Sequence, residues 1–343
     1  IIINKNKYLI MLLFIFIGGF FYNNAEAIQG TFIIRNDATG GNCNLIGIWD
    51  FDSKTCVLTA DIDASAYWLT SAIQVQDNDI TIDGNNYTII SNNSDDGVYI
   101  SNRSGITVKN LRLIGNASGI RIEGVNNSNF TNNTFSYNTF GVYSYNSSNN
   151  KFLNNNFNFN NYGGLLIFNS HYNLISGNNL NGNVGISLPH ADGNQIVDNI
   201  INSNHAGIDM SNSSVNLIKN NKISGGSIVG IRIVYGYYNK ILLNTIFNNR
   251  VGLQFYYAQF NTIHNNNFIS NFIQVISDFS QPQFFNLSLP DSGNYWDNFS
   301  ISNQGCNDIN NDNICDSPYI FTGGQDNLPW TKQDGWKSTP LPT

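Results

Sequence analysis

Short segments in which apolar and polar residues alternate recur along this chain every 21 to 23 residues, and a glycine opens each of them. Alternation with a period of two is typical of β-strands, and no helical periodicity interrupts it between Ile80 and Val275. A fixed period of this length indicates a solenoid. The opening glycines are Gly97, Gly119, Gly141, Gly164, Gly185, Gly207, Gly230 and Gly252.

A second motif, Asn-x-apolar-x-x-Asn-x-apolar, keeps the same period, as at Asn194, Ile196, Asn199 and Ile201. Coils of a parallel β-helix stack at about 4.8 Å, so each residue faces its counterpart on the next coil. A column of carboxylates would repel itself there, whereas amides both donate and accept hydrogen bonds along the column. The sequence therefore predicts an all-β fold, a right-handed parallel β-helix of about nine coils with N- and C-terminal caps.

The ends of the chain lack the repeat, which divides the sequence into four predicted parts. Residues 1–27 are predicted to be a secretory signal, because two lysines precede an apolar run and Ala25-Glu26-Ala27 precedes the cleavage point. The alternative is an uncleaved membrane anchor. We expect residues 28–76 to form the N-terminal cap, 77–278 the coils and 279–343 the C-terminal cap with an acidic calcium-type loop.

The remaining composition favours an exported protein. After the signal, no apolar segment is long enough to span a bilayer, so we expect a secreted, periplasmic or cell-surface location. A net charge of −7 and only 11% charged residues argue against nucleic acid as a partner. Four cysteines, Cys43, Cys56, Cys306 and Cys315, allow three disulfide connectivities, of which local pairing is the simplest.

Five motifs stand out along the chain: Asp83 to Ile89 at the start of the coils, the Cys43 to Cys56 loop with Trp49-Asp50, Gly293 to Trp296, Asp316 to Tyr319 and Asp326 to Pro329. Together they resemble NosD-type right-handed β-helix proteins, and this resemblance covers nearly the whole mature chain. It implies a β-helix, and such repeats are also described as carbohydrate-binding and sugar-hydrolysis domains. The family takes its name from a copper-maturation factor.

An acidic loop in the C-terminal cap has oxygen ligands at every second position, as calcium requires. The predicted ligands are the side chains of Asp308, Asn310, Asp312 and Asp316 and the carbonyl of Ile314. We expect Ca²⁺ to order the cap, with an affinity in roughly the 10⁻⁴ to 10⁻³ M range of extracellular modules. The alternative is an acidic turn that binds no metal.

The second residue after each glycine is predicted to point outward, which places one column of side chains along the surface. Aromatic and planar polar groups in such a shallow row suit a polysaccharide lying across several coils. The alternative is an ordinary solvated face in which Asp209 pairs with Arg232 on the next coil. The column is Tyr99, Arg121, Tyr143, Leu166, Ser187, Asp209, Arg232 and Gln254.

A second outward column, at the fifth residue after each glycine, ends in Tyr235 and Tyr257. Sugar rings stack on aromatic faces, so we include both tyrosines among the candidate carbohydrate-binding residues. The alternative is that stacked tyrosines only stiffen the coils.

The function that these features favour is a non-catalytic surface module that presents a rigid face to a glycan or another surface. The alternative is a polysaccharide lyase or glycoside hydrolase, with Arg121, Asp209 and Arg232 as candidate catalytic residues. Hydrolysis needs two neighbouring carboxylates, yet Glu123 is predicted to face Ser101 and Tyr145.

The third hypothesis, a periplasmic copper-maturation role, needs soft ligands in one cluster. The four histidines, His171, His190, His205 and His264, occupy different phases of the repeat, and Met210 is predicted to point inward.

Overall fold

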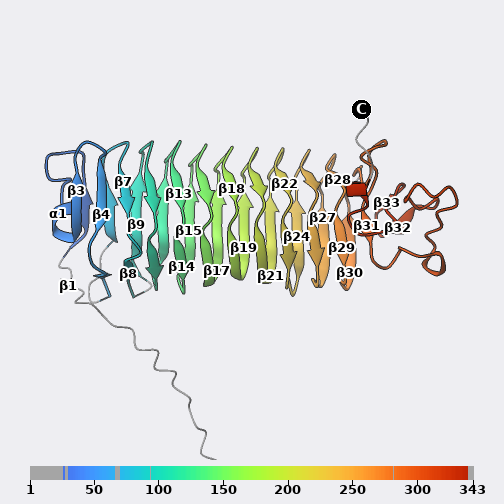
Figure 1. Cartoon of the computed structure of the whole chain (residues 1–343), viewed down its shortest axis with the longest axis horizontal. Helices are drawn as coiled ribbons and strands as arrows, with labels where there is room; N and C mark the ends of the chain where they lie inside the picture. Colours follow the sequence, from blue (N-terminus) through green and yellow to red (C-terminus); the bar gives the residue numbers. More distant parts are fainter. Residues whose placement is uncertain (1–25, 28–29, 66–69, 93, 281, 339–343) are drawn as a thin grey trace, which may run out of the picture.

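Successive turns of the chain stack on one axis (Figure 1), and their short strands pair in three parallel ladders. The computed structural model describes residues 26–27, 30–65, 70–92, 94–280 and 282–338. About ten turns are wound as a parallel β-helix, which confirms the predicted fold. Helical segments in the described ranges are limited to α1 (Cys43–Ile46) and the 3-10 turns η1 (Ser302–Gln304) and η2 (Gly335–Ser338).

The first ladder is one continuous sheet, parallel except at its N-terminal edge, where β3 and β4 are antiparallel. It contains β3 (Gly47–Asp50), β4 (Thr55–Leu58), β7 (Thr81–Asp83), β10 (Thr107–Lys109), β13 (Asn129–Thr131), β16 (Lys151–Leu153), β18 (Leu174–Ser176), β20 (Gln195–Val197), β22 (Leu217–Lys219), β25 (Lys240–Leu242) and β28 (Thr262–His264).

The second ladder follows the first in every turn. Its separate strands are β1 (Glu26–Ala27), β5 (Ile62–Asp63), β8 (Thr88–Ile90), β11 (Arg112–Ile114), β14 (Thr134–Ser136), β23 (Lys222–Ser224), β26 (Thr245–Phe247), β29 (Asn267–Ile269) and β31 (Tyr295–Trp296).

The third ladder, called here the Gly-led ladder, contains the strands that the glycines open. Three long strands, β17, β19 and β21, run through both the second and the Gly-led ladder without a break. Its strands are β2 (Phe32–Ile34), β6 (Ser71–Val75), β9 (Asp96–Ser101), β12 (Ser118–Glu123), β15 (Phe140–Tyr145), β17 (Asn156–Phe168), β19 (Asn179–Pro189), β21 (Ile200–Ser211), β24 (Val229–Val234), β27 (Val251–Tyr256) and β30 (Ile273–Asp278).

The interior is built from columns of identical or similar side chains. Ile196, Ile218 and Ile241 are in register and fully buried, and Met210 is buried as predicted. Phenylalanines stack in the same way, with ring centroids 4.7 Å apart for Phe135 and Phe157. Because apolar burial contributes roughly 1.5 to 3 kcal/mol per such side chain, these columns supply the main stabilisation of every coil.

Buried asparagines join each coil to the next, as predicted. In the longest column, each side-chain Oδ1 accepts a hydrogen bond from the backbone N–H of the preceding coil at 2.9 to 3.1 Å. The side chains thereby satisfy corner amides that no strand can pair. This column is Asn133, Asn155, Asn178, Asn199, Asn221, Asn244, Asn266 and Asn294.

The glycines that open the strands are required by close backbone approach. A Cβ built on Gly119 would lie 2.5 Å from the Phe135 ring and 2.7 Å from the carbonyl oxygen of Gly141. Gly141 meets Phe157 and Gly164 in the same manner. A side chain at this position would force neighbouring coils apart, which explains why glycine sets the period.

The N-terminal end carries the first of the two predicted local disulfides, Cys43–Cys56, which links α1 to β4. The parallel register extends upstream of residue 77, because β4 pairs with β7 and β6 pairs with β9. The predicted signal lies outside the described residues except for β1. Among the described residues, no helix is long and apolar enough to cross a membrane.

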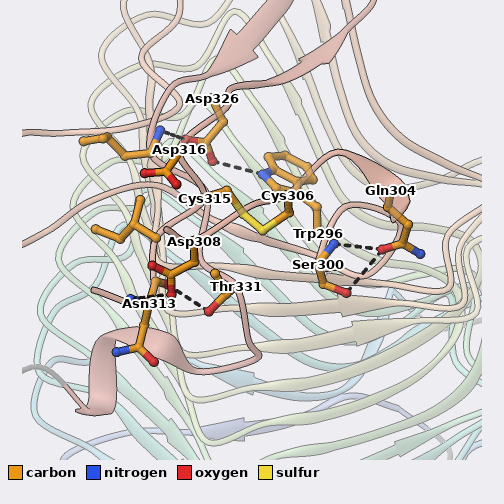
Figure 2. Close-up of a disulfide and its surroundings, with 12 residues drawn as sticks. Trp296, Ser300, Gln304, Cys306, Asp308, Asn313, Cys315, Asp316, Asp326 and Thr331 are labelled. Carbon is orange, nitrogen blue, oxygen red and sulfur yellow. Dashed lines mark hydrogen bonds between the residues drawn. A yellow bond between two sulfur atoms is a disulfide. The ribbon is translucent and has the colours of Figure 1, made fainter. Parts of the chain in front are cut away.

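The C-terminal end closes the longest asparagine column with a carboxylate. Asp326, at the end of the hairpin of β32 (Tyr319–Phe321) and β33 (Gly324–Asp326), is fully buried. Its Oδ2 accepts hydrogen bonds from the backbone N–H of Asn294 at 2.7 Å and from Trp296 Nε1 at 3.0 Å. Figure 2 shows the bond between Asp326 and Trp296. An aspartate accepts without needing to donate onward, so it can end the column.

Candidate functional site

The predicted outward column exists in the predicted register on the outer face of the Gly-led ladder. Arg121 lies between Tyr99 and Tyr143 on neighbouring coils, and Asp209 lies between Ser187 and Arg232. Most of these side chains are only partly exposed, because each lies against its neighbours on adjacent coils. The column therefore forms a shallow face.

Arg121 is the centre of a polar cluster near the N-terminal end of this face. Its guanidinium carbon lies 5.9 Å from the Tyr99 ring centroid and 5.4 Å from that of Tyr143, within cation–π range. Arg121 Nε donates to Glu123 Oε1 at 2.9 Å, and the Tyr99 hydroxyl donates to Glu123 Oε2 at 2.9 Å. Sequence register placed Glu123 correctly opposite Ser101 and Tyr145, but it did not reveal these contacts within and between coils.

Asp96 completes the cluster, and sequence reasoning missed it. Its Oδ2 lies 3.8 Å from Arg121 Nη1, its Oδ1 accepts the backbone N–H of Ser118 at 3.0 Å, and its side chain is only 8% exposed. Asp96 directly precedes Gly97 in the sequence. The signal was present, since the equivalent positions on later coils carry no acid: Ser118, Phe140, Gly163, Val184, Ala206, Val229, Val251 and Ile273.

The two carboxylates of the cluster have different electrostatic environments. Desolvation raises the pKa of Asp96 to about 6, although Ser118 and Arg121 oppose it. Desolvation also acts to raise the pKa of Glu123, but hydrogen bonds from Arg121 and Tyr99 outweigh it and hold this pKa below its ordinary value. Near neutral pH, Asp96 therefore exchanges a proton while Glu123 stays ionised.

The second charged pair on the face is Asp209 with Arg232. Arg232 donates from Nε to Asp209 Oδ1 at 2.8 Å and from Nη2 to Oδ2 at 2.5 Å, which is the pairing expected under the alternative of an ordinary solvated face. Asp209 lies four coils from Arg121 in the ladder register. The structure therefore does not bring the three candidate catalytic residues together.

The tyrosines of the second column stack at a corner of the C-terminal coils. Tyr235 and Tyr257 are parallel with centroids 5.3 Å apart, and Phe279 continues the stack at 5.2 Å. All three have φ near +50°, which costs each about 1 to 2 kcal/mol. Because each ring covers part of its neighbour's face, the stacking favours the stiffening role. Glycan contact by Tyr235 and Tyr257 stays a prediction.

The acidic loop of the C-terminal cap is braced by the second predicted disulfide, Cys306–Cys315 (Figure 2). Asp308 accepts backbone N–H groups of Asp312 and Asn313 at 3.0 Å, and Asp316 accepts that of Ile309 at 2.7 Å. In the part of the chain that the structure describes, no three His, Cys, Asp or Glu side chains group as a metal site would. Calcium binding here stays a prediction.

The residues do not fit a copper site. Both disulfides use all four cysteines, and Met210 is fully buried in the core. His264 is buried in β28, and burial lowers its pKa, whereas His190 lies at a left-handed corner after β19. His205 is exposed in β21, and His171 follows the end of β17. Within the described ranges, soft ligands are therefore not assembled in one place.

A groove of about 960 Å³ lies away from the predicted face, between the C-terminal tail and the second ladder. Trp336 and Lys337 contribute to it from the tail, and Lys222, Thr245 and Phe247 from β23 and β26. It contains none of the predicted site residues.

Two family profiles match overlapping parts of the chain. The profile described as periplasmic copper-binding protein (NosD) matches residues 158–301, and the profile described as right handed beta helix region matches residues 62–199. These matches confirm the resemblance expected from the sequence motifs. No curated protein gives a significant match.

Solved structures with a similar fold include sugar-active enzymes. DFA-IIIase from Arthrobacter chlorophenolicus A6 without its lid is 12% identical, with a TM-score of 0.53 over 74% of this chain and 72% of that chain. The mannuronan C-5 epimerase AlgE6 A-module from Azotobacter vinelandii is 14% identical, with a TM-score of 0.44 over 66% and 78%. Another structure of DFA-IIIase from the same organism is 11% identical, with a TM-score of 0.46. The match covers 61% of this chain, which spans only 58% of the length of that chain. At these identities the likeness shows the fold alone.

Proposed function

Because this chain is a NosD-like right-handed parallel β-helix, we propose that it binds glycan chains along the outer face of the Gly-led ladder. The observation that carries the proposal is the guanidinium of Arg121 held between the rings of Tyr99 and Tyr143. Aromatic surface combined with planar donors and acceptors suits sugar rings and their hydroxyl groups.

The shape of the face also supports a chain-like ligand. The coils stack in one straight row (Figure 1), and the outward column is partly exposed from Tyr99 to Gln254. A polymer can therefore contact several coils at once, and many weak contacts then add up without a deep pocket.

We further propose that the protein works outside the cytoplasm, as a secreted, periplasmic or surface protein. Its two disulfides support this location, since such bonds persist in oxidising compartments. A soluble or surface-bound glycan is an available ligand in all three places.

Binding to an array of neutral and acidic glycans tests the proposal. We expect a defined subset of glycans to bind, and Tyr143→Ala to weaken that binding about tenfold or more, which corresponds to about 1.4 kcal/mol. Tyr172→Ala is the matched control, because Tyr172 is an exposed tyrosine at a corner away from this face. Equal binding by both variants, or no binding to any glycan, would contradict the proposal.

A further inference from the structure

Two carboxylates from neighbouring coils contact one guanidinium on the proposed binding face. Asp96 comes from β9 and Glu123 from β12, and both lie against Arg121. Tyr99 and Tyr143 flank the same guanidinium. An acid pair, a cation and aromatic rings therefore meet in one place on an otherwise weakly charged surface.

The fold does not require a carboxylate at Asp96. The equivalent residues Ala206, Val229 and Val251 form a small apolar cluster outside the main core, so this position accepts apolar side chains. Ser118 holds this buried carboxylate through its backbone N–H and its side chain, and Arg121 lies 3.8 Å away, yet desolvation still outweighs these contacts and raises the pKa of Asp96. Such a costly group is more often retained for chemistry than for stability.

We propose that Asp96 and Glu123 form the acid and base of a glycoside hydrolase site that cleaves the glycan bound over Tyr99 and Tyr143. This inference rests on the proposed function, because the glycan must first lie on this face. Two carboxylates flanking the scissile bond are the general requirement for glycoside hydrolysis.

In this reaction, Asp96 donates its proton to the glycosidic oxygen as the bond from that oxygen to the anomeric carbon breaks. Water attacks the anomeric carbon and gives a proton to the carboxylate of Glu123. The products are a hemiacetal and an alcohol, and proton exchange with solvent restores both carboxyl groups. Atoms and charge balance with water as the only co-reactant.

The electrostatic environments agree with these roles. The pKa of Asp96, raised to about 6, keeps a fraction of this group protonated near neutral pH, whereas Glu123 stays ionised. A pair of carboxyl groups whose pKa values are pushed apart is typical of an acid and a base in one site. Arg121 acts as a positioning residue, because it contacts both carboxylates.

The charge of the cluster indicates a neutral substrate. With Asp96 protonated, the charges of Arg121 and Glu123 cancel, and with Asp96 ionised the cluster is negative. Arg121 is already engaged by Glu123 through Nε and Nη2, so it has little charge to offer a uronate. We therefore expect neutral polysaccharides to be cleaved and acidic ones to be left intact.

The experiment incubates the full chain with neutral and acidic polysaccharides and measures new reducing ends and product masses. We expect saturated products, each cleavage adding one water, from at least one neutral polysaccharide that binds. Asp96→Asn and Glu123→Gln, which preserve shape, should each lower the rate at least 100-fold while binding persists. Asp83→Asn is the matched control, since it removes a partly buried carboxylate ion-paired to a coil neighbour, Lys109, on the first ladder.

The pH profile separates a proton donor from a structural carboxylate. The wild-type rate should fall as pH rises through about 6, the pKa of Asp96, and the residual activity of Asp96→Asn should lack that fall. Glycan binding without any release of reducing ends would overturn this inference and leave the proposed function standing. Unchanged rates in both variants, or unsaturated products, would also overturn it, whereas no binding at all would overturn both proposals.

Discussion

The inner asparagine columns and the outer column of the Gly-led ladder share one register but differ in what occupies it. The inner column from Asn133 to Asn294 repeats the same residue on every coil, and each side chain has the same hydrogen-bond partners. The outer column changes from coil to coil, from Tyr99 and Arg121 to Gln254. The inner positions have the same surroundings on every coil, so the same residue fits each of them. The outer positions face solvent, which accepts many different residues.

In a repeat protein, residues that serve the fold recur on every coil, whereas residues that serve function need not recur. A residue that every coil shares is explained by the fold, so the ladder asparagines need no other role. A costly group that only one coil carries, such as Asp96, is not explained by the fold. We therefore expect substitutions in the inner asparagine columns to lower stability strongly. Substitutions in the outer column should change it little, except where the outer face holds a buried charge.

Replacing one inner asparagine should have the largest effect on stability. Asn221→Ala removes the acceptor of the Asn199 backbone N–H and Nδ2 and leaves the Ile196 carbonyl without this donor. At about 1 to 3 kcal/mol for each unsatisfied buried group, we expect a loss of roughly 3 kcal/mol or more in the free energy of unfolding. Urea denaturation measures the loss, with Ser187→Ala on the outer column as the control expected to change it by less than about 0.5 kcal/mol.

Hydrogen exchange locates the same effect. Because each coil contacts only its neighbours, amides of the coils flanking Asn221 should exchange faster, while distant coils should keep their protection. Similar costs for Asn221→Ala and Ser187→Ala would mean that the inner columns are not what holds the coils together.

The end of the inner column gives a second prediction, on pH. Burial raises the pKa of Asp326 to about 7, against the hydrogen bonds that it accepts from Asn294, Trp296 and Leu328. In the unfolded chain, the pKa of this aspartate is near its ordinary value. The folded state therefore binds the proton on Asp326 more tightly than the unfolded chain does. Stability from this group is therefore greatest below pH 4 and falls as pH rises from about 4 to 7, by at most about 1.4 kcal/mol per pH unit.

Thermal unfolding across that pH range, followed by tryptophan fluorescence, checks the sign. Trp296 contacts Asp326 and so reports on the cap. Asp326→Asn is expected to lower overall stability, because the new side-chain NH₂ would meet the N–H donors of Asn294 and Trp296. The substitution should also flatten the pH dependence, because asparagine does not titrate. A pH dependence that is the same in this variant would assign the titration to another group.

The inner columns and the pairing of Asp209 with Arg232 could be predicted because both follow from the repeat itself. A period of 21 to 23 residues fixes which residues face each other, and period-2 alternation fixes which point inward. Both disulfides were the simplest pairing of neighbouring cysteines.

Asp96 could not be predicted by the same rule. Alternation places Asp96 in phase with Val98 and Ile100, which are buried in the core, yet Asp96 contacts Arg121 on the outer face. Alternation predicts burial at this position but not the partner of its carboxylate, so it does not reveal the contact with Arg121. The sequence likewise places Tyr235 and Tyr257 in a surface column but does not reveal that both lie at left-handed corners. Only the backbone angles show that conformation and its energetic cost.

The acidic loop offers a smaller effect that lies outside the coils. If Asp308, Asp312 and Asp316 bind calcium, a concentration about tenfold above Kd stabilises the cap by about 1.4 kcal/mol. Melting in calcium and in chelator measures this, and Asp312→Asn should abolish the difference without lowering the transition in chelator. Equal transitions at millimolar calcium would support the alternative of a turn that binds no metal.

The smallest expected effect is that of the ion pair on the outer column. Arg232 is about one-third exposed, so its interaction with Asp209 is screened by solvent and contributes less than about 1 kcal/mol despite its two hydrogen bonds. We therefore expect Asp209→Asn to lower the free energy of unfolding by less than 1 kcal/mol, and Asp209→Asn/Arg232→Gln to differ little from it. Denaturation of the single and double variants, at low and high salt, measures the coupling. A loss as large as that of Asn221→Ala would show that the outer face also holds the coils together, and the distinction between the two columns would then fail.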